Sequence, residues 1–215
     1  MEDLNLKIKV PPADQIVSEY KQLLVVLSGP SGVGKDAVIN RLRMLDRPWH
    51  FVVTTTTRKK RPKESEGIDY NFVSNQEFWK MVNEGEFLEH AEVYGNLYGV
   101  PKKEVKNAIK SGKHAILKID VQGAATIRDK IPNAVFIFMM PNSMNELAYR
   151  LKERSTENKA DMEIRIRIAH GEVEYAKEFE YLVVNWDFQI DRTAECIDAI
   201  ITAETCKVKP RIISI

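Results

Sequence analysis

The sequence predicts an α/β fold in which a parallel sheet is flanked by helices. Apolar runs recur at residues 23–27, 115–119, 134–140 and 181–184, and segments with helical spacing separate them. Continuous apolar runs of this length are typical of strands that are buried on both faces of a sheet. The chain of 215 residues amounts to roughly 1.4 domains by the usual length prior, which indicates one compact body.

The first element is an N-terminal extension, which we assign to residues 1–22. Within it, residues 4–10 alternate apolar and polar side chains and then meet two prolines, which predicts a short strand or arm ended by a breaker. The apolar strand at residues 23–27 leads through a glycine-rich turn into a segment with helical spacing. Strand, loop and helix therefore follow one another directly.

Further helices are predicted at residues 122–131, 143–152 and 187–207. In residues 162–179 the isoleucines alternate as in a strand, but the length of the segment and its interleaved charges favour a helix. We assign the core of the fold to residues 23–53 and 99–207, and a C-terminal tail to residues 208–215.

The alternation of strands and helices breaks at residues 54–98, which we expect to form an inserted lobe. A charged run at residues 58–66 is followed there by short aromatic segments, which predict short antiparallel strands. Residues 154–161 are charged, lack large apolar side chains and lie between two helical patterns. They are typical of a mobile lid, with an ordinary solvated loop as the alternative.

Composition and charge exclude several classes of function. Lys and Arg number 32 against 31 Asp and Glu, a net charge of +1 that gives no overall field to hold a nucleic acid. The apolar runs fall short of the roughly 20 residues that span a bilayer, and the acidic start differs from a signal peptide. We therefore expect a cytoplasmic protein without a membrane partner.

Cysteine and histidine give no sign of a disulfide framework or a zinc site. If the segment between them is helical, Cys196 and Cys206 lie about 15 Å apart, too far for a disulfide. The histidines have no Cys or His neighbours at ligand spacing, so a metal ion would be held by oxygen.

Residues 29–36 form a glycine-rich loop that fits the phosphate-binding pattern G-x-x-x-x-G-K between a strand and a helix. Glycines let backbone N–H groups point at phosphate oxygens, the helix N-terminus adds about half a positive charge, and Lys35 reaches the outer phosphates. We expect nucleoside triphosphate binding, with a structural glycine turn as the alternative. The next residue is normally Ser or Thr, whose hydroxyl binds Mg²⁺. Here Asp36 could ligate the ion directly or repel the phosphates.

Asp120 follows the predicted strand at residues 115–119, at the end where open parallel sheets expose ligand-binding residues. A cap for the next helix is the plain alternative, as is an ion pair with Lys118, which strand alternation places on the same face. Asp120 alone therefore does not define a site.

Two groups of polar side chains could bind phosphate, because guanidinium forks grip its oxygens and phenol hydroxyls add neutral donors. A solvated charge run is the alternative for residues 58–61. In the second group, Arg165 and Arg167 point to nearly opposite sides of a helix, so only one can face the phosphates, and we choose Arg165. The first group comprises Arg58, Arg61, Tyr70 and Tyr98, and the second Arg150, Arg154 and Arg165.

In this order the motifs resemble those of guanylate kinases, nucleoside monophosphate kinases that move the terminal phosphoryl group of ATP to GMP. The resemblance spans roughly residues 23–206, and it implies a P-loop kinase core with an inserted GMP-binding lobe and a mobile lid. The segments that carry it are residues 29–35, 55–58 with Arg61 and Glu64, 67–72, 87–89, 98–99, 119–123, 150–151 with Arg154, and 184–185.

The resemblance also implies roles for individual residues. Glu89 and Asp120 would accept hydrogen bonds from the N1–H and the N2 amino group of guanine, donors that adenine lacks, and Thr54 could donate to O6. It assigns catalysis to Lys35, Arg58, Arg154 and Arg165, and GMP binding to Thr54, Arg58, Arg61, Glu64, Tyr70, Glu89, Tyr98 and Asp120. It assigns ATP binding to Gly29, Pro30, Ser31, Gly32, Val33, Gly34, Lys35, Asp36, Arg150 and Asn185, with Asp36 as the ligand of Mg²⁺.

Two residues depart from the family pattern, in which Ser or Thr is usual at Asp36 and Asp or Glu is common at Lys118. If the strand and the helix lie side by side, the formal charges at these two positions sum to zero in this chain. With the residues that are usual in the family they sum to minus one. We hypothesise that Asp36 supplies the metal-side carboxylate and that Lys118 offsets its charge.

Two other functions stay open at this point. One is a catalytically inactive guanylate-kinase-like domain that binds proteins, against which Lys35 and the lid-side arginines argue. The other is a P-loop kinase for a different phosphorylated acceptor, against which Glu89 and Asp120 argue. We expect ATP and GMP as partners, no nucleic acid, and a monomer or homodimer.

Overall fold

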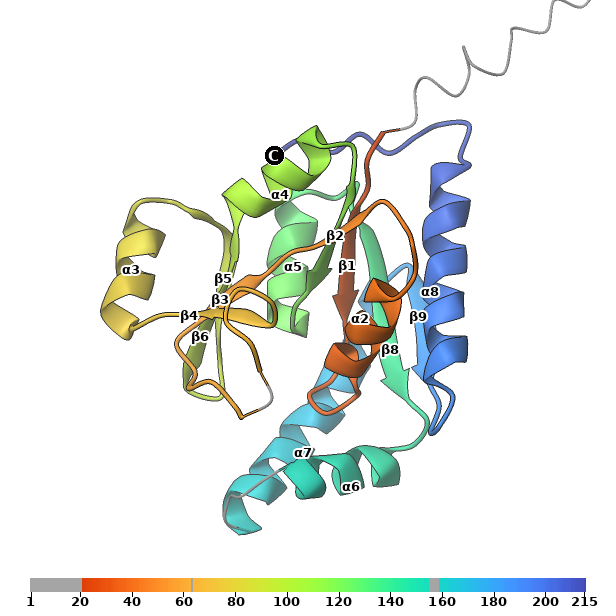
Figure 1. Ribbon diagram of the computed structural model, residues 1–215. Coiled ribbons are helices and arrows are strands. Elements are labelled where there is room, and N and C mark those ends of the chain that lie inside the picture. Colours follow the sequence, from red (N-terminus) through yellow and green to blue (C-terminus); the bar gives the residue numbers. More distant parts are fainter. Residues whose placement is uncertain (1–20, 63, 155–158) are drawn as a thin grey trace, which may run out of the picture.

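The computed structural model describes residues 21–62, 64–154 and 159–215. Within this part of the chain, the larger sheet holds five parallel strands in the order β2-β7-β1-β8-β9 (Figure 1). The strands are β1 (Leu24–Ser28), β2 (Trp49–Phe51), β7 (His114–Lys118), β8 (Val135–Pro141) and β9 (Tyr181–Asn185). Because β1 lies at the centre, the loop at its carboxyl end opens between two neighbouring strands.

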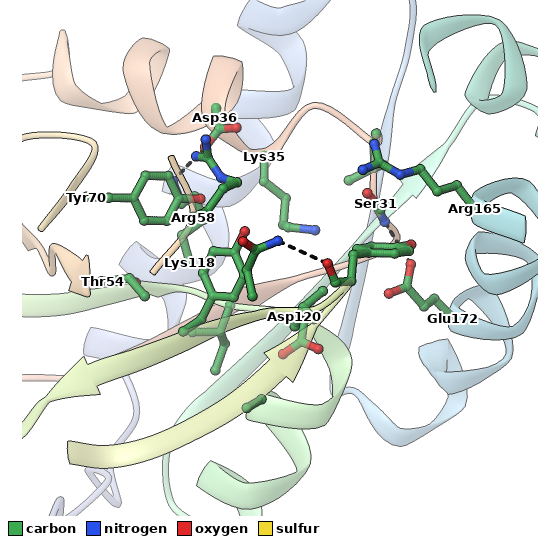
Figure 2. A pocket seen from close by; sticks show the side chains of 18 of the residues that line it. Ser31, Lys35, Asp36, Thr54, Arg58, Tyr70, Lys118, Asp120, Arg165 and Glu172 are labelled. Carbon is green, nitrogen blue, oxygen red and sulfur yellow. Dashed lines mark hydrogen bonds and ion pairs between the residues drawn. The ribbon is translucent and has the colours of Figure 1, made fainter. Parts of the chain in front are cut away.

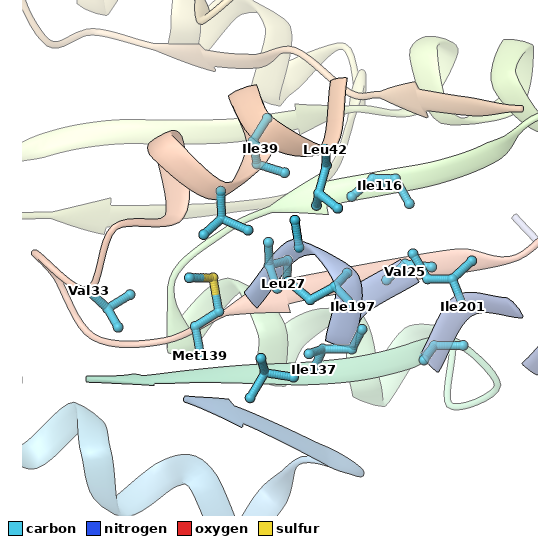
Figure 3. Packing of buried hydrophobic residues seen from close by; sticks show 14 of the residues in the cluster. Val25, Leu27, Val33, Ile39, Leu42, Ile116, Ile137, Met139, Ile197 and Ile201 are labelled. Atoms are coloured by element: carbon cyan, nitrogen blue, oxygen red, sulfur yellow. The ribbon is translucent and has the colours of Figure 1, made fainter. Parts of the chain in front are cut away.

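Helices cover both faces of this sheet. They are α2 (Lys35–Arg43), α4 (Lys102–Lys110), α5 (Val121–Lys130), α6 (Met144–Arg154), α7 (Lys159–Val173), the 3-10 helix η1 (Glu174–Glu178) and α8 (Ile190–Thr205). Alternate residues of β1 enter two hydrophobic clusters: Val25 and Leu27 pack with α2 and α8 (Figure 3), and Leu24 and Val26 pack with α4 and α5. The predicted α/β fold class is therefore confirmed.

Most of the predicted core elements form. The four apolar runs become β1, β7, β8 and β9, the three helical patterns become α5, α6 and α8, and residues 162–179 are largely helical through α7 and η1. The sequence analysis missed β2 and α4. β2 has three residues, which is too short to reveal a period, and α4 buries only Val105 and Ala108.

A second sheet of four strands, in the order β4-β3-β6-β5, follows the core strand β2. Its strands are β3 (Thr54–Thr56), β4 (Tyr70–Phe72), β5 (Phe87–Val93) and β6 (Asn96–Pro101). β6 pairs antiparallel with β3 and β5 as predicted, but β3 and β4 pair parallel, so the prediction was wrong for that pair. The connection at residues 57–69 is long enough to return β4 in the parallel direction.

The same lobe holds a helix that the sequence analysis missed, α3 (Asn75–Asn83). Ser74 caps its start: the Ser74 hydroxyl accepts from the Glu77 N–H, and the Glu77 carboxylate accepts from the Ser74 N–H, the reciprocal pair of a capping box. Phe78 of α3 is buried and stacks on Phe87 of β5 at 4.7 Å between ring centroids. The division of the chain into core, lobe and lid stays a prediction.

The ends of the chain and the lid are described in part. Residues 1–20, which hold the predicted N-terminal strand or arm, and residues 155–158 of the predicted lid lie outside the described residues. Cys196 and Cys206 are exposed free thiols. None of the helices in the described part combines the length and apolar character needed to cross a membrane.

Candidate functional site

The glycine-rich loop lies between β1 and α2 and forms one wall of a pocket (Figure 2). Gly34, the residue before α2, has φ 102°, and a Cβ added there would lie 2.6 Å from the Asn185 side-chain nitrogen, so only glycine fits. Lys35 folds back over the loop, and its ammonium donates to the carbonyls of Gly29 at 2.6 Å and Pro30 at 3.2 Å. Burial lowers the pKa of Lys35.

Two predicted ATP-binding residues, Arg150 and Asn185, hydrogen-bond to the backbone of the loop. The side-chain nitrogen of Asn185 and the guanidinium of Arg150 donate to the Val33 carbonyl at 2.8 and 3.0 Å. Arg150 also pairs with Asp187 at 2.6 Å and with Glu146. Arg150 and Asn185 line a second hollow with Gly34, Ala37, Trp186, Phe188 and Ile190. The structure thus separates these two residues from the main pocket, on the other side of the loop.

The two residues that depart from the family pattern meet directly. The ammonium of Lys118, at the end of β7, donates to a carboxylate oxygen of Asp36, in the first turn of α2, at 2.6 Å. The same ammonium lies 4.2 Å from the ring centroid of Tyr70. Burial acts to lower the pKa of Lys118, but Tyr70 and Asp36 outweigh it and the pKa is raised. Lys118 therefore pairs with Asp36, and the simpler expectation of an ion pair with Asp120 was wrong.

The predicted phosphate-binding group gathers on the lobe side of the pocket. Arg58, Arg61, Tyr70 and Tyr98 all line the pocket. Glu64 does not line it, but it holds the arginines: its carboxylate accepts from the Arg58 guanidinium at 2.7 Å and from the Arg61 backbone N–H at 2.8 Å. Arg58 also lies over the Tyr70 ring at 5.2 Å. Two guanidinium groups, both paired with Glu64, and two phenols thus line one side of the pocket, an arrangement suited to a phosphate.

Glu89 of β5 and Asp120, the N-cap of α5, meet at the floor of the pocket. One oxygen of each carboxylate is buried and makes no hydrogen bond within the described part of the chain, a costly state that a ligand donor would relieve. Burial and the Asp120 charge raise the pKa of Glu89 to about 8. A Cβ on Gly123 would lie 2.9 Å from Glu89 and 3.1 Å from Asp120, so this glycine makes room for both. Thr54 is buried and lines the same pocket.

On the opposite side of the pocket, α7 contributes Arg165 and Glu172 (Figure 2). The Glu172 carboxylate, buried at 8% exposure, accepts from the Ser31 backbone N–H at 2.8 Å. Arg165 faces the pocket as predicted, whereas Arg167 does not line it and is exposed. Arg154 ends α6, and its side chain lies outside the described residues. The sequence analysis missed Glu172, although its spacing of two helical turns from Arg165 places both on one face.

Comparisons with known proteins identify the family to which the chain is similar. The guanylate kinase family model matches residues 21–204. The chain is 43% identical over 191 residues to the guanylate kinase of Halalkalibacterium halodurans, covering 89% of this chain and 93% of that protein. It is 42% identical over 194 residues to guanylate kinase 2, chloroplastic/mitochondrial, of Oryza sativa subsp. japonica, covering 90% and 68%. A crystal structure of guanylate kinase from Anaplasma phagocytophilum superposes with a TM-score of 0.73 at 35% identity, covering 88% and 89% of the two chains.

Proposed function

The chain belongs to the guanylate kinase family, and we propose how its residues divide the work of moving the γ-phosphoryl group of ATP to GMP. The reaction gives ADP and GDP, and dGMP is a second possible acceptor. The observation that carries the assignment is a pair of buried carboxylate oxygens, one on Glu89 and one on Asp120, for which residues 21–62, 64–154 and 159–215 supply no hydrogen bond. Both lie in the same pocket as the phosphate-binding loop.

Guanine is the acceptor base that this pair suits. Its N1–H and N2 amino group are adjacent donors, and each would satisfy one of the two open oxygens. Adenine offers no donors at those positions, so it would leave the open oxygen of each residue without a donor. The hydroxyl of Thr54, a residue at 3% exposure that lines the same pocket, would donate a hydrogen bond to O6. The GMP phosphate would then lie among Arg58, Arg61, Tyr70 and Tyr98.

ATP would lie on the other side, with its phosphates over the N-terminus of α2. The loop backbone N–H groups and the helix N-terminus attract anions. Lys35, now bonded to the Gly29 and Pro30 carbonyls, would turn toward the outer phosphates. Arg150 and Asn185, which hold the Val33 carbonyl, border the second hollow, where we place the adenine.

The residues present fit Mg²⁺ as a cofactor held chiefly by the nucleotide. Asp36 offers a hard oxygen ligand, and its side chain keeps 44% exposure beside the loop despite the Lys118 contact. The substrate phosphates would supply further oxygen ligands, as is usual for Mg²⁺ bound with a nucleotide. When bound, Mg²⁺ would offset charge on the β- and γ-phosphates.

Phosphoryl transfer needs alignment and charge stabilisation more than covalent help from the protein. Arg58 would orient the attacking phosphate of GMP through its Glu64-braced guanidinium. Lys35, Arg154 and Arg165 would neutralise negative charge that spreads over the equatorial oxygens of the transferring group. The cytoplasmic location and the choice between monomer and homodimer stay predictions.

The rival functions lack a comparable observation. A protein-binding scaffold has no physical need for a half-buried lysine on a phosphate loop, and the family relatives named above are guanylate kinases. A sugar phosphate acceptor could use Glu89 and Asp120 for hydroxyl groups, so it is the stronger rival.

One substrate panel separates these functions. Purified protein would be assayed with ATP and Mg²⁺ against GMP, dGMP, AMP, UMP and ribose phosphates. We expect phosphorylation of GMP and dGMP well above that of the others. Preference for a ribose phosphate would refute guanine recognition, and the absence of any transfer would favour the scaffold.

A further inference from the structure

Tyr94 stands at the tip of the β5–β6 hairpin in an unusual backbone conformation. Val93 pairs with Asn96, which leaves Tyr94 and Gly95 as a two-residue turn with φ angles of 51° and 71°. Turns with two positive φ angles favour Asn-Gly or Gly-Gly, and a bulky side chain in the left-handed region is strained. The Asn96 side chain donates to the Tyr94 carbonyl at 3.0 Å and helps to hold the turn. Such strain commonly marks a functional position.

The Tyr94 side chain belongs to the lobe by sequence but contacts the donor side of the pocket. Its ring lies 5.2 Å from the guanidinium carbon of Arg165 on α7. Its hydroxyl is buried and lies close enough to the Ser31 side chain of the phosphate-binding loop to interact with it. Burial, with the nearby Glu172 charge, raises the pKa of Tyr94 to about 12, so the phenol stays neutral.

The residues that Tyr94 meets are already tied to one another. Glu172, on the same helix as Arg165, accepts from the Ser31 N–H of the phosphate-binding loop at 2.8 Å. Figure 2 shows Ser31, Arg165 and Glu172 together on one side of the pocket. Tyr94 therefore joins the tip of the lobe to a unit made of the loop and α7.

We propose that Tyr94 is a positioning residue that fixes Arg165 above the phosphate-binding loop, so that the guanidinium is in place for the transferring phosphoryl group. An aromatic face attracts a guanidinium and limits its orientation, and preplaced charge lowers the barrier without further reorganisation. Because the ring comes from the lobe, the lobe that binds GMP also orients a donor-side arginine. This inference rests on the proposed function of the site.

Two single variants test the role of the ring. Tyr94→Asn removes the ring but suits the turn better, whereas Tyr94→Phe keeps the ring and removes the hydroxyl. For Tyr94→Asn we expect kcat about tenfold lower, within the range of a cation–π contact, with the KM for GMP changed less than about twofold and an unfolding temperature no lower than that of the wild type. For Tyr94→Phe we expect kcat within about threefold of the wild type.

A double-mutant cycle with Arg165→Met tests whether the two residues act together. If Tyr94 works through Arg165, the variant Tyr94→Asn/Arg165→Met has the kcat of Arg165→Met alone. Three results would overturn the proposal. The first is a double variant whose loss of kcat is the product of the losses in the two single variants. The others are an unchanged kcat in Tyr94→Asn and a loss of kcat in Tyr94→Phe equal to that in Tyr94→Asn. A wild type that uses another acceptor would refute the proposed function instead, and the same cycle with that acceptor would still decide the role of Tyr94.

Discussion

The pKa of Glu89 makes GMP affinity depend on pH. In the free protein Glu89 is buried at 3% exposure next to Asp120, and burial followed by the Asp120 charge raises its pKa to about 8. At neutral pH the carboxyl group is therefore mostly protonated, and its hydroxyl oxygen then acts as a hydrogen-bond donor instead of accepting from the guanine donor that faces Glu89. Guanine binding favours the ionised form, so it lowers this pKa and releases a proton.

The size of the effect follows from the ionised fraction. Affinity for GMP scales with the fraction of protein in the competent, ionised state. For a pKa near the value above, that fraction rises roughly 50-fold between pH 6 and pH 8. The direction of the pKa shift fixes the sign of the effect. Because the pKa of Glu89 is raised in the free protein, GMP binds weakly at low pH and more tightly as pH rises.

Titration calorimetry of GMP at several pH values, with wild type and Glu89→Gln, measures this effect. In buffers of different ionisation enthalpy, we expect the wild type to release up to about one more proton per GMP than the variant near neutral pH. The phosphate of GMP titrates equally with both proteins, so the variant serves as its control. Glu89→Gln should also bind ATP like the wild type.

Two results would refute this reasoning. Parallel pH profiles for wild type and Glu89→Gln would mean that Glu89 does not change protonation when GMP binds. An equal loss of affinity for ATP and GMP in the variant would mean that Glu89 does not read the base.

Four further predictions concern the charge exchange, the ion pair of Arg211 with Glu204, the acid stability that Glu204 contributes, and the core. Asp36→Ser should lower the ATP- and Mg²⁺-dependent kcat about tenfold by leaving Lys118 without its ion pair. The double variant Asp36→Ser/Lys118→Asp should recover most of the lost kcat. Undiminished activity in Asp36→Ser would show that the carboxylate has no special role. Arg211→Met should lower the urea unfolding free energy by about 3 kcal/mol, because Arg211 pairs at 2.6 Å with Glu204, itself 2% exposed; a loss below about 1 kcal/mol would mark the pair as a surface contact. Burial would raise the pKa of Glu204, but hydrogen bonds from Arg211, Lys207 and Tyr181 outweigh it and lower this pKa to about 2. The ionised Glu204 therefore stabilises the fold above its ordinary pKa, and this stability is lost as pH falls toward 2. In Glu204→Gln, the unfolding free energy should fall less steeply with pH over this acidic range. Leu42→Ala should cost about 3 kcal/mol through the cavity it leaves, and retained wild-type stability would contradict the packing of α2 on β1.

Patterns within short segments predicted much of the part of the site that we assign to ATP, the phosphate donor. The loop at residues 29–35 combines a strand, fixed glycines, Lys35 and a following helix in one short segment, so its geometry follows from neighbouring residues. Helix geometry indicated that only one of Arg165 and Arg167 can face the phosphates, the family resemblance selected Arg165, and Arg165 is the one that lines the pocket. These inferences needed no knowledge of residues far apart in the chain.

The part of the site that we assign to GMP, the phosphate acceptor, depends on contacts between segments that are distant in the sequence. The sequence analysis predicted these contacts less well. The parallel pairing of β3 with β4 is set by a long crossover, for which the charged residues 57–69 give no periodic signal. The space that Gly123 leaves for Glu89 and Asp120 depends on how α5 meets β5. Tyr94 reads in the sequence as one aromatic residue among several, and only the turn geometry distinguishes it.

One arrangement recurs at both ends of the pocket: a tyrosine of the lobe meets a cation of the core. Tyr70 lies 4.2 Å from the Lys118 ammonium, and Tyr94 lies 5.2 Å from the Arg165 guanidinium. Both cations therefore have an aromatic partner before any nucleotide is bound. Charges that are held in place beforehand stabilise a transition state at a lower cost of reorganisation than charges that must be gathered. Since both rings come from the lobe, the position of the lobe should affect kcat more than it affects the binding of ATP.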